Sequence, residues 1–131
     1  MRVVSFGDLA LDVVVRLGQP LALGADATSS ISLSPGGQGA NVAAWVAALG
    51  GEAAWLGKRG ADDAGALVAG RLEAIGVTLV GPIAEAGTGI IVSLVGPDGE
   101  RSMCPDRGVA TTLRSDELRE EMLDCDHLHV S

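Results

Sequence analysis

The most informative segment of the sequence is Pro35-Gly36-Gly37-Gln38-Gly39-Ala40-Asn41. It follows Thr28–Ser34, where polar and apolar side chains alternate as they do in a half-exposed strand. It leads into Ala40–Leu49, an alanine-rich stretch that ends at Gly50-Gly51 and is therefore expected to be a helix with a glycine C-cap. A strand, an abrupt glycine turn and a helix in this order indicate an α/β protein.

The flanking sequence repeats this succession of strands and helices. Short apolar runs predict strands at Arg2–Phe6, Leu11–Leu17, Ala53–Leu56, Ile90–Val95 and Asp126–Val130. Glu100–Cys104 is expected to return as a hairpin partner of Ile90–Val95 after the turn Gly96-Pro97-Asp98-Gly99. Further helices are expected over Asp62–Ile75 and from Ser115 through Asp124. The order predicts a parallel core sheet with some antiparallel strands set apart from it.

Composition narrows the classes of function. The chain has 131 residues, 47% of them hydrophobic and 20% charged, which is enough for one compact domain. Nine basic residues against 17 acidic ones give a formal charge of −8, which argues against binding a nucleic-acid backbone. The only aromatic residues are Phe6, Trp45 and Trp55, too few for a platform that stacks single-stranded bases. We therefore expect no nucleic-acid partner.

Cysteine spacing and hydropathy indicate a cytoplasmic protein. Cys104 and Cys125 lie far apart, outside any metal-ligand spacing, and are expected to be reduced thiols. No apolar stretch approaches the roughly 18 residues of a membrane span, so no membrane partner is expected. His127 and His129 lie in the last expected strand, which reads as buried, and we expect them on opposite faces. No metal site is therefore predicted.

The glycine segment matches neither of two common nucleotide-binding motifs. A dinucleotide fingerprint needs a third glycine where this chain has Val42. A P-loop needs Lys followed by Ser or Thr, but Lys58, the only lysine, precedes Arg59. What remains is a glycine turn whose amides can approach a ligand closely, with Asn41 offering a donor and an acceptor. The alternative is a tight strand–helix turn in which Asn41 merely caps the helix.

The sequence resembles the PfkB, or ribokinase-like, carbohydrate kinases. The resemblance covers essentially the whole chain, and its separated motifs occur in the order found in the family. The matching stretches are Val3–Asp8 with Asp12, Gly36–Ala43, Ala48–Gly51, Leu56–Gly65, Leu72–Val77, Thr88-Gly89 and Pro97–Arg101.

The resemblance implies a fold, and it implies which part of the kinase domain this chain represents. The expected fold is α/β, a ribokinase-like Rossmann-type α/β/α sandwich with a small β lid. Residues 1–131 would be the N-terminal part of a PfkB-type kinase domain, with lid strands near 11–34 and 89–104. The C-terminal half, which holds the catalytic Asp, the anion hole and the ATP site in the family, would be absent. No catalytic residue is therefore expected in this chain.

The resemblance also implies a substrate site. Asp12 matches the acid that holds sugar hydroxyls, a task that suits a carboxylate because its two oxygens accept paired donors. Gly37, Gln38 and Asn41 match the substrate-binding turn. Arg107 matches a position where some acid-sugar kinases of the family place an arginine, although an exposed loop cation is the alternative.

The implied activity is ATP-dependent phosphorylation of a hydroxyl on a sugar or related polyol. ATP and Mg²⁺ are the expected cofactors, with K⁺ as a candidate, and their ligands are expected mostly in the C-terminal half. Ala10 and Gln38 replace the Asn and Lys of ribokinases proper, which argues against ribose itself. A nucleoside is the nearest alternative substrate. The alternative function is a truncated, catalytically inactive module that binds a sugar or forms a homodimer through its lid strands.

Overall fold

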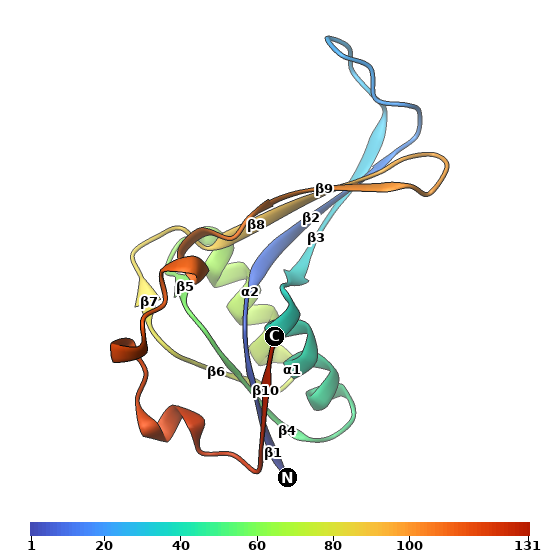
Figure 1. The fold of residues 1–131 in the computed structure, drawn as a ribbon. Coiled ribbons are helices and arrows are strands. Elements are labelled where there is room, and N and C mark those ends of the chain that lie inside the picture. The colour runs from blue at the N-terminus through green and yellow to red at the C-terminus, as the bar shows by residue number, and fades with distance from the viewer.

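A parallel sheet forms the centre of the computed structural model, which describes residues 1–131 (Figure 1). Its strands, in spatial order, are β10 (His127–Val130), β1 (Arg2–Phe6), β4 (Glu52–Leu56) and β6 (Val77–Val80). Parallel neighbours need crossover connections, and two helices supply them: α1 (Gln38–Ala48) before β4 and α2 (Asp63–Ala74) before β6. Neither helix is long and apolar enough to cross a membrane.

A second sheet projects away from this core (Figure 1). Its strands, in spatial order, are β3 (Ser29–Gly36), β2 (Ala10–Leu17), β8 (Gly89–Val95) and β9 (Arg101–Asp106). β2–β3 and β8–β9 are antiparallel hairpins, and β2 runs parallel to β8. We call these four strands the projecting sheet. Two-residue strands β5 (Arg59–Gly60) and β7 (Ile83–Ala84) form a separate parallel pair.

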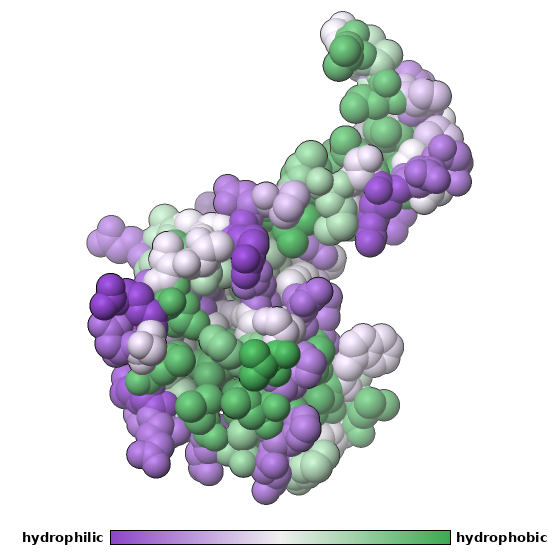
Figure 2. Space-filling model, in the orientation of Figure 1, coloured by the Kyte–Doolittle hydropathy of each residue, from purple (hydrophilic) through white to green (hydrophobic).

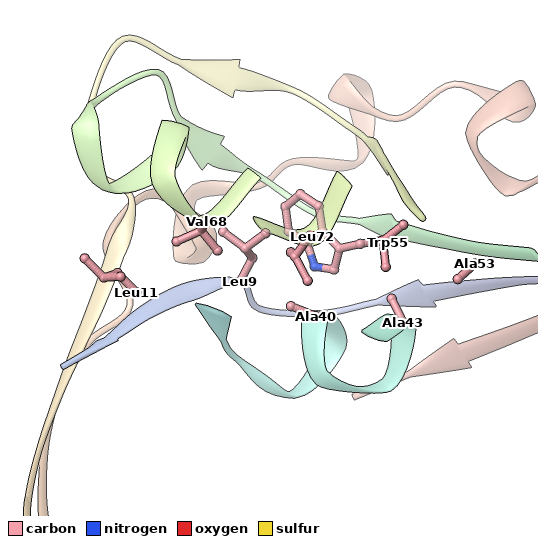
Figure 3. Close-up of a cluster of buried hydrophobic side chains, with 9 residues drawn as sticks. Leu9, Leu11, Ala40, Ala43, Ala53, Trp55, Val68 and Leu72 are labelled. Atoms are coloured by element: carbon pink, nitrogen blue, oxygen red, sulfur yellow. The ribbon is translucent and has the colours of Figure 1, made fainter. Parts of the chain in front are cut away.

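The main core lies between the parallel sheet and the two helices. Leu9, Leu72 and Trp55 meet at its centre (Figure 3). Successive side chains of a strand point to opposite faces of the sheet, so β4 contributes to two hydrophobic clusters. Trp55 faces the helices, whereas Leu56 faces the opposite side of the sheet together with Val4. The Trp55 ring is anchored by its Nε1, which donates a hydrogen bond to the Gly7 carbonyl at 3.0 Å. This bond fixes the end of β1 beside the functional region described below.

The opposite face of the sheet differs from the sequence prediction. Instead of one helix from Ser115 through Asp124, the chain forms two 3₁₀ turns, η2 (Ser115–Glu117) and η3 (Glu120–Leu123), and a further 3₁₀ turn, η1 (Gly108–Thr112), precedes them. The Arg114 amide bonds to the Glu117 carboxylate at 2.9 Å, and the backbone at Leu118 is extended. The bond from the Arg114 amide is a capping-box bond that supports the start of η2, whereas the extended backbone at Leu118 and Arg119 ends this turn before η3 begins. Within residues 1–131 this is therefore a sandwich with α-helices on one face and short turns on the other.

The last strand and the end of α2 also differ from expectation. β10 pairs with β1 in parallel, as predicted, but Val130 is 62% exposed because β10 is an edge strand. Ile75, the last residue of the helix expected over Asp62–Ile75, is instead the C-cap of α2 and is exposed. β6 was not anticipated because its four residues are too few to show a periodicity.

Candidate functional site

The start of α1 packs directly on the connection between β1 and β2. Gly37 has φ 94° and ψ 141°, and a Cβ there would lie 2.9 Å from the Leu9 Cα. A Cβ on Gly39 would lie 2.8 Å from the Gly7 Cα. The Ala40 amide donates to the Asp8 carbonyl at 3.2 Å. Glycines are required here because two backbones touch without side chains between them.

Asn41 does not cap the helix, so that alternative is wrong. α1 has no side-chain cap, and the Asn41 amide already donates to the Gly37 carbonyl at 2.9 Å, within the first turn. The Asn41 side chain is exposed and borders a cavity. Its amide group is therefore available to a ligand.

An open cavity of about 620 Å³ lies between the start of α1, the β1–β2 connection and the projecting sheet. All five residues that the sequence singled out line it: Asp12, Gly37, Gln38, Asn41 and Arg107. The structure thus brings together residues that are up to 95 positions apart, from 12 to 107, in the chain.

Other lining residues were missed by sequence reasoning. Asp8, Ile91, Arg101 and Met103 also border the cavity. Strand alternation was the available signal, since Arg101 and Met103 lie two residues apart on β9 and share a face. Asp12 and Ile91 are register partners and share that face across β2 and β8. The strand register, which the sequence did not predict, brings these residues of β8 and β9 to the cavity beside the glycine turn.

Asp12 has an unmet hydrogen-bonding capacity. Its Oδ1 is buried and has no partner within the chain. Gly36 makes room for it, since a Cβ there would clash with the Asp12 carboxylate. Burial raises the pKa of Asp12, and the positive charge of Arg101 acts in the opposite direction. A buried acceptor without a partner costs free energy that a ligand hydroxyl would recover.

Arg107 is fixed by a two-point ion pair. Its Nε donates to Asp8 Oδ2 at 2.5 Å and its Nη2 to Asp8 Oδ1 at 2.9 Å. This bond joins the end of β9 to the end of β1 across 99 residues of sequence. Although the Arg107 side chain is 58% exposed, its ion pair with Asp8 fixes its position, unlike that of an unpaired arginine in an exposed loop. The hydrogen bond to Asp8 and the negative charge of that group raise the pKa of Arg107.

A second cavity of about 570 Å³ adjoins the first. Asp8, Arg107 and Ser131 line both, so the Asp8–Arg107 pair stands between them. Lys58 also lines the second cavity, but its Nζ is engaged by Glu117 Oε1 at 2.7 Å.

No metal centre is found among residues 1–131. No group of three or more His, Cys, Asp or Glu side chains could hold a metal ion. The expectation that His127 and His129 point to opposite faces is wrong. They pair with Val3 and Ser5 of β1, and residues two apart in a strand share a face.

Comparison with known proteins identifies the family. The sequence profile of the pfkB family carbohydrate kinases matches residues 1–131. The chain belongs to this family.

Similar kinases are known from distant organisms. The chain is 38% identical to the ATP-dependent ribose-1-phosphate kinase of Halopiger xanaduensis, over all of this chain and 46% of that protein. It is 37% identical to probable fructokinase-4 of Arabidopsis thaliana, over 92% of this chain and 37% of that protein. The chain thus spans less than half the length of these two relatives.

Solved kinase structures confirm the predicted ribokinase-like α/β fold. Ribokinase from Cryptococcus neoformans in complex with ADP superposes with a TM-score of 0.75 at 30% identity, covering 98% of this chain and 41% of that one. Fructokinase from Xylella fastidiosa superposes with a TM-score of 0.81 at 25% identity, covering 98% and 40%.

Asp62 ties this kinase fold together at the base of the projecting sheet. Its carboxylate accepts hydrogen bonds from the amides of Gly65 (2.9 Å), Gly87 (2.7 Å) and Thr88 (2.9 Å). It thereby caps α2 and holds the segment that enters β8. Burial raises the pKa of Asp62, but hydrogen bonds from Thr88, Gly65 and Gly87 outweigh this effect and hold the pKa well below its usual range.

Replacing Asp62 with alanine is expected to lower the free energy of unfolding by about 2 kcal/mol, because a helix cap and two loop bonds are lost. Since the folded pKa is depressed, the contribution is complete above the unfolded value of about 3.9 and declines as pH falls toward the folded pKa. Urea unfolding at pH 7 and pH 3 measures both effects. Asp63→Ala in the same turn is the control. Equal losses for the two variants would contradict the anchor role.

Proposed function

We propose that this chain is the sugar-binding part of an ATP-dependent kinase that phosphorylates a hydroxyl of a sugar or related polyol. The observation that carries the proposal is the buried, unpartnered Oδ1 of Asp12 at the wall of the cavity beside α1. A hydroxyl-rich ligand supplies the donor that this oxygen lacks.

Each lining residue has a task that its chemistry suits. Asp12 accepts hydrogen bonds from two sugar hydroxyls and so fixes the orientation of the ring. Gln38 and Asn41, at the exposed start of α1, offer amide donors and acceptors to further hydroxyls. Ile91 and Met103 present apolar surface to the C–H face of the ring. Gly37 keeps the backbone close enough for these contacts.

The nature of the substrate is part of the proposal. Among the relatives, one is a kinase of ribose 1-phosphate and several are fructokinases, so a phosphorylated and a neutral sugar are both candidates. A nucleoside is a further candidate, although no aromatic side chain lines the cavity to stack on a base.

ATP as phosphoryl donor follows from the family, and the Cryptococcus ribokinase holds ADP. Mg²⁺ would neutralise charge on the transferred phosphoryl group, and K⁺ is a candidate activator. The residues present do not fit a metal ion, because they form no ligand cluster, so we derive no step through one. We propose that the groups that bind ATP and take the hydroxyl proton lie outside residues 1–131, and that the whole enzyme is cytoplasmic.

The alternative is a catalytically inactive module that binds a sugar or dimerises. The projecting sheet supports dimerisation, because apolar side chains lie at its surface (Figure 2). Ile31 and Leu33 of β3 and Ile90 of β8 are all exposed. A second copy could cover them, since exposed apolar strands tend to associate.

Titration calorimetry with ribose, fructose, ribose 1-phosphate and adenosine tests the proposal, followed by an assay of ADP formation in the presence of Mg·ATP. Binding of a sugar is expected. Because the groups that bind ATP are proposed to lie outside residues 1–131, ADP formation is assayed in the whole protein. ADP formation there supports the kinase, and binding of a sugar without it favours the inactive module. If neither these four compounds nor a sugar acid such as gluconate binds, the sugar site itself is wrong.

A further inference from the structure

The cavity contains one cation that no residue of the chain neutralises by contact. Four charged residues line the cavity, and two of them, Asp8 and Arg107, form an ion pair with each other. The remaining two are Asp12 and Arg101. Arg101 takes part in none of the ion pairs or side-chain hydrogen bonds of the structure.

Arg101 and Asp12 face the same space without touching. Both side chains line the cavity, and although burial raises the pKa of Asp12, the positive charge of Arg101 acts against this shift. No ion pair forms between them, although both line the same open cavity. A ligand can therefore lie between them, with hydroxyls toward Asp12 and an acceptor toward Arg101.

The guanidinium is suited to an anion. Arginine presents planar, paired N–H donors that match the two oxygens of a phosphate or carboxylate. A neutral sugar placed here would satisfy Asp12 but leave the cation without a counter-charge. Arg107 is less suited to this task because Asp8 already occupies its donors in two-point geometry.

We infer that Arg101 determines substrate specificity by binding an anionic group of the sugar, so that the substrate is a sugar phosphate or a sugar acid. The inference rests on the proposed function, because it assigns the charge of the ligand in the same cavity. Hydroxyls of the anionic sugar are held by Asp12, and the anionic substituent extends along β9 toward Arg101.

Variants of two arginines test this assignment in the full 131-residue chain. Arg101→Gln removes the charge at an exposed position without a hydrogen bond, so the fold is expected to persist. Arg16→Gln is the matched control. Arg16 lies in the same row of the projecting sheet, since both arginines are register partners of Val95, but it does not line the cavity. Circular dichroism verifies that both variants fold, and Arg101→Lys shows whether a charge alone suffices.

Calorimetry is carried out with ribose 1-phosphate, gluconate, ribose, fructose and inorganic phosphate. We expect an anionic sugar to bind more tightly than the neutral sugars, and Arg101→Gln to weaken it by about 10- to 100-fold, the effect of losing a charge-assisted hydrogen bond. Binding of neutral sugars should be unchanged, and Arg16→Gln should bind like the unaltered chain. The responses to ribose 1-phosphate and gluconate distinguish phosphate from carboxylate.

Three outcomes overturn the inference. If a neutral sugar binds as tightly as the anionic ones, the specificity is wrong while the sugar site stands. If Arg101→Gln weakens neutral and anionic sugars equally, Arg101 only adjusts the charge of Asp12. If phosphate binds and no sugar does, both this inference and the proposed sugar site fail.

Discussion

Replacing Gly37 with alanine is expected to lower the free energy of unfolding by about 3 kcal/mol or more. The φ of 94° with ψ of 141° lies in a region that glycine alone adopts readily, and other residues held in such regions cost of order 1–3 kcal/mol. The new Cβ would also press on the backbone of Asp8 and Leu9, which belongs to the packed connection after β1 and cannot move aside. Overpacking of this kind adds about 1–3 kcal/mol.

Two glycines of the same chain serve as controls in urea unfolding. Gly50→Ala meets no atom within 4 Å at φ 83°, so only the backbone term of about 1–2 kcal/mol is expected. Gly70→Ala lies within α2 in open space and should stabilise by about 0.5–1 kcal/mol through helix propensity. If Gly37→Ala and Gly50→Ala were equally destabilised, the close approach of the two backbones would not limit this position.

Replacing Asp12 with asparagine is expected to weaken sugar binding by about 100-fold or more. Two charge-assisted hydrogen bonds to hydroxyls become neutral or are lost, and each contributes about 1.5–3 kcal/mol. Because burial raises the pKa of Asp12, binding by the unaltered chain should also fall with decreasing pH sooner than it would for an ordinary aspartate.

The same substitution is expected to stabilise the fold slightly at neutral pH. A raised folded pKa means that protonation favours the folded state, so the charge on Asp12 opposes folding at pH values above that pKa. Asparagine removes this opposition. Calorimetry and thermal unfolding of the same sample measure the two effects, with Asp26→Asn in the exposed loop as control. A variant that binds sugar normally would remove Asp12 from the site.

Elements that depend on neighbouring residues were predictable from the sequence. The β8–β9 hairpin forms at Gly96-Pro97-Asp98-Gly99, where Gly99 has φ 84° and its amide bonds to the Gly96 carbonyl at 2.9 Å. Asp62 caps α2 within three residues of sequence. The glycine turn before α1 was also recognisable, because close backbone contacts leave a conspicuous pattern of glycines.

Predictions failed where distant contacts compete with local preference. The acidic segment after Ser115 was predicted as one helix, but Met122 packs under the sheet and the extended backbone at Leu118 and Arg119 divides the segment into 3₁₀ turns. β10 has an apolar pattern, yet its position at the sheet edge leaves it exposed. Neither the edge position nor the packing partner is written in a local window of sequence.

The sequence by itself determined the order of most strands and of both α-helices, the glycine turn and, through resemblance, the residues of the candidate site. Only the tertiary structure decided that Arg107 pairs with Asp8 and that Arg101 joins Asp12 at one cavity. The physical reason is the sequence separation of the residues that interact. Caps and turns are set by hydrogen bonds over a few residues, whereas the charge balance of a cavity depends on strand register between segments some 90 residues apart, such as β2 and β9.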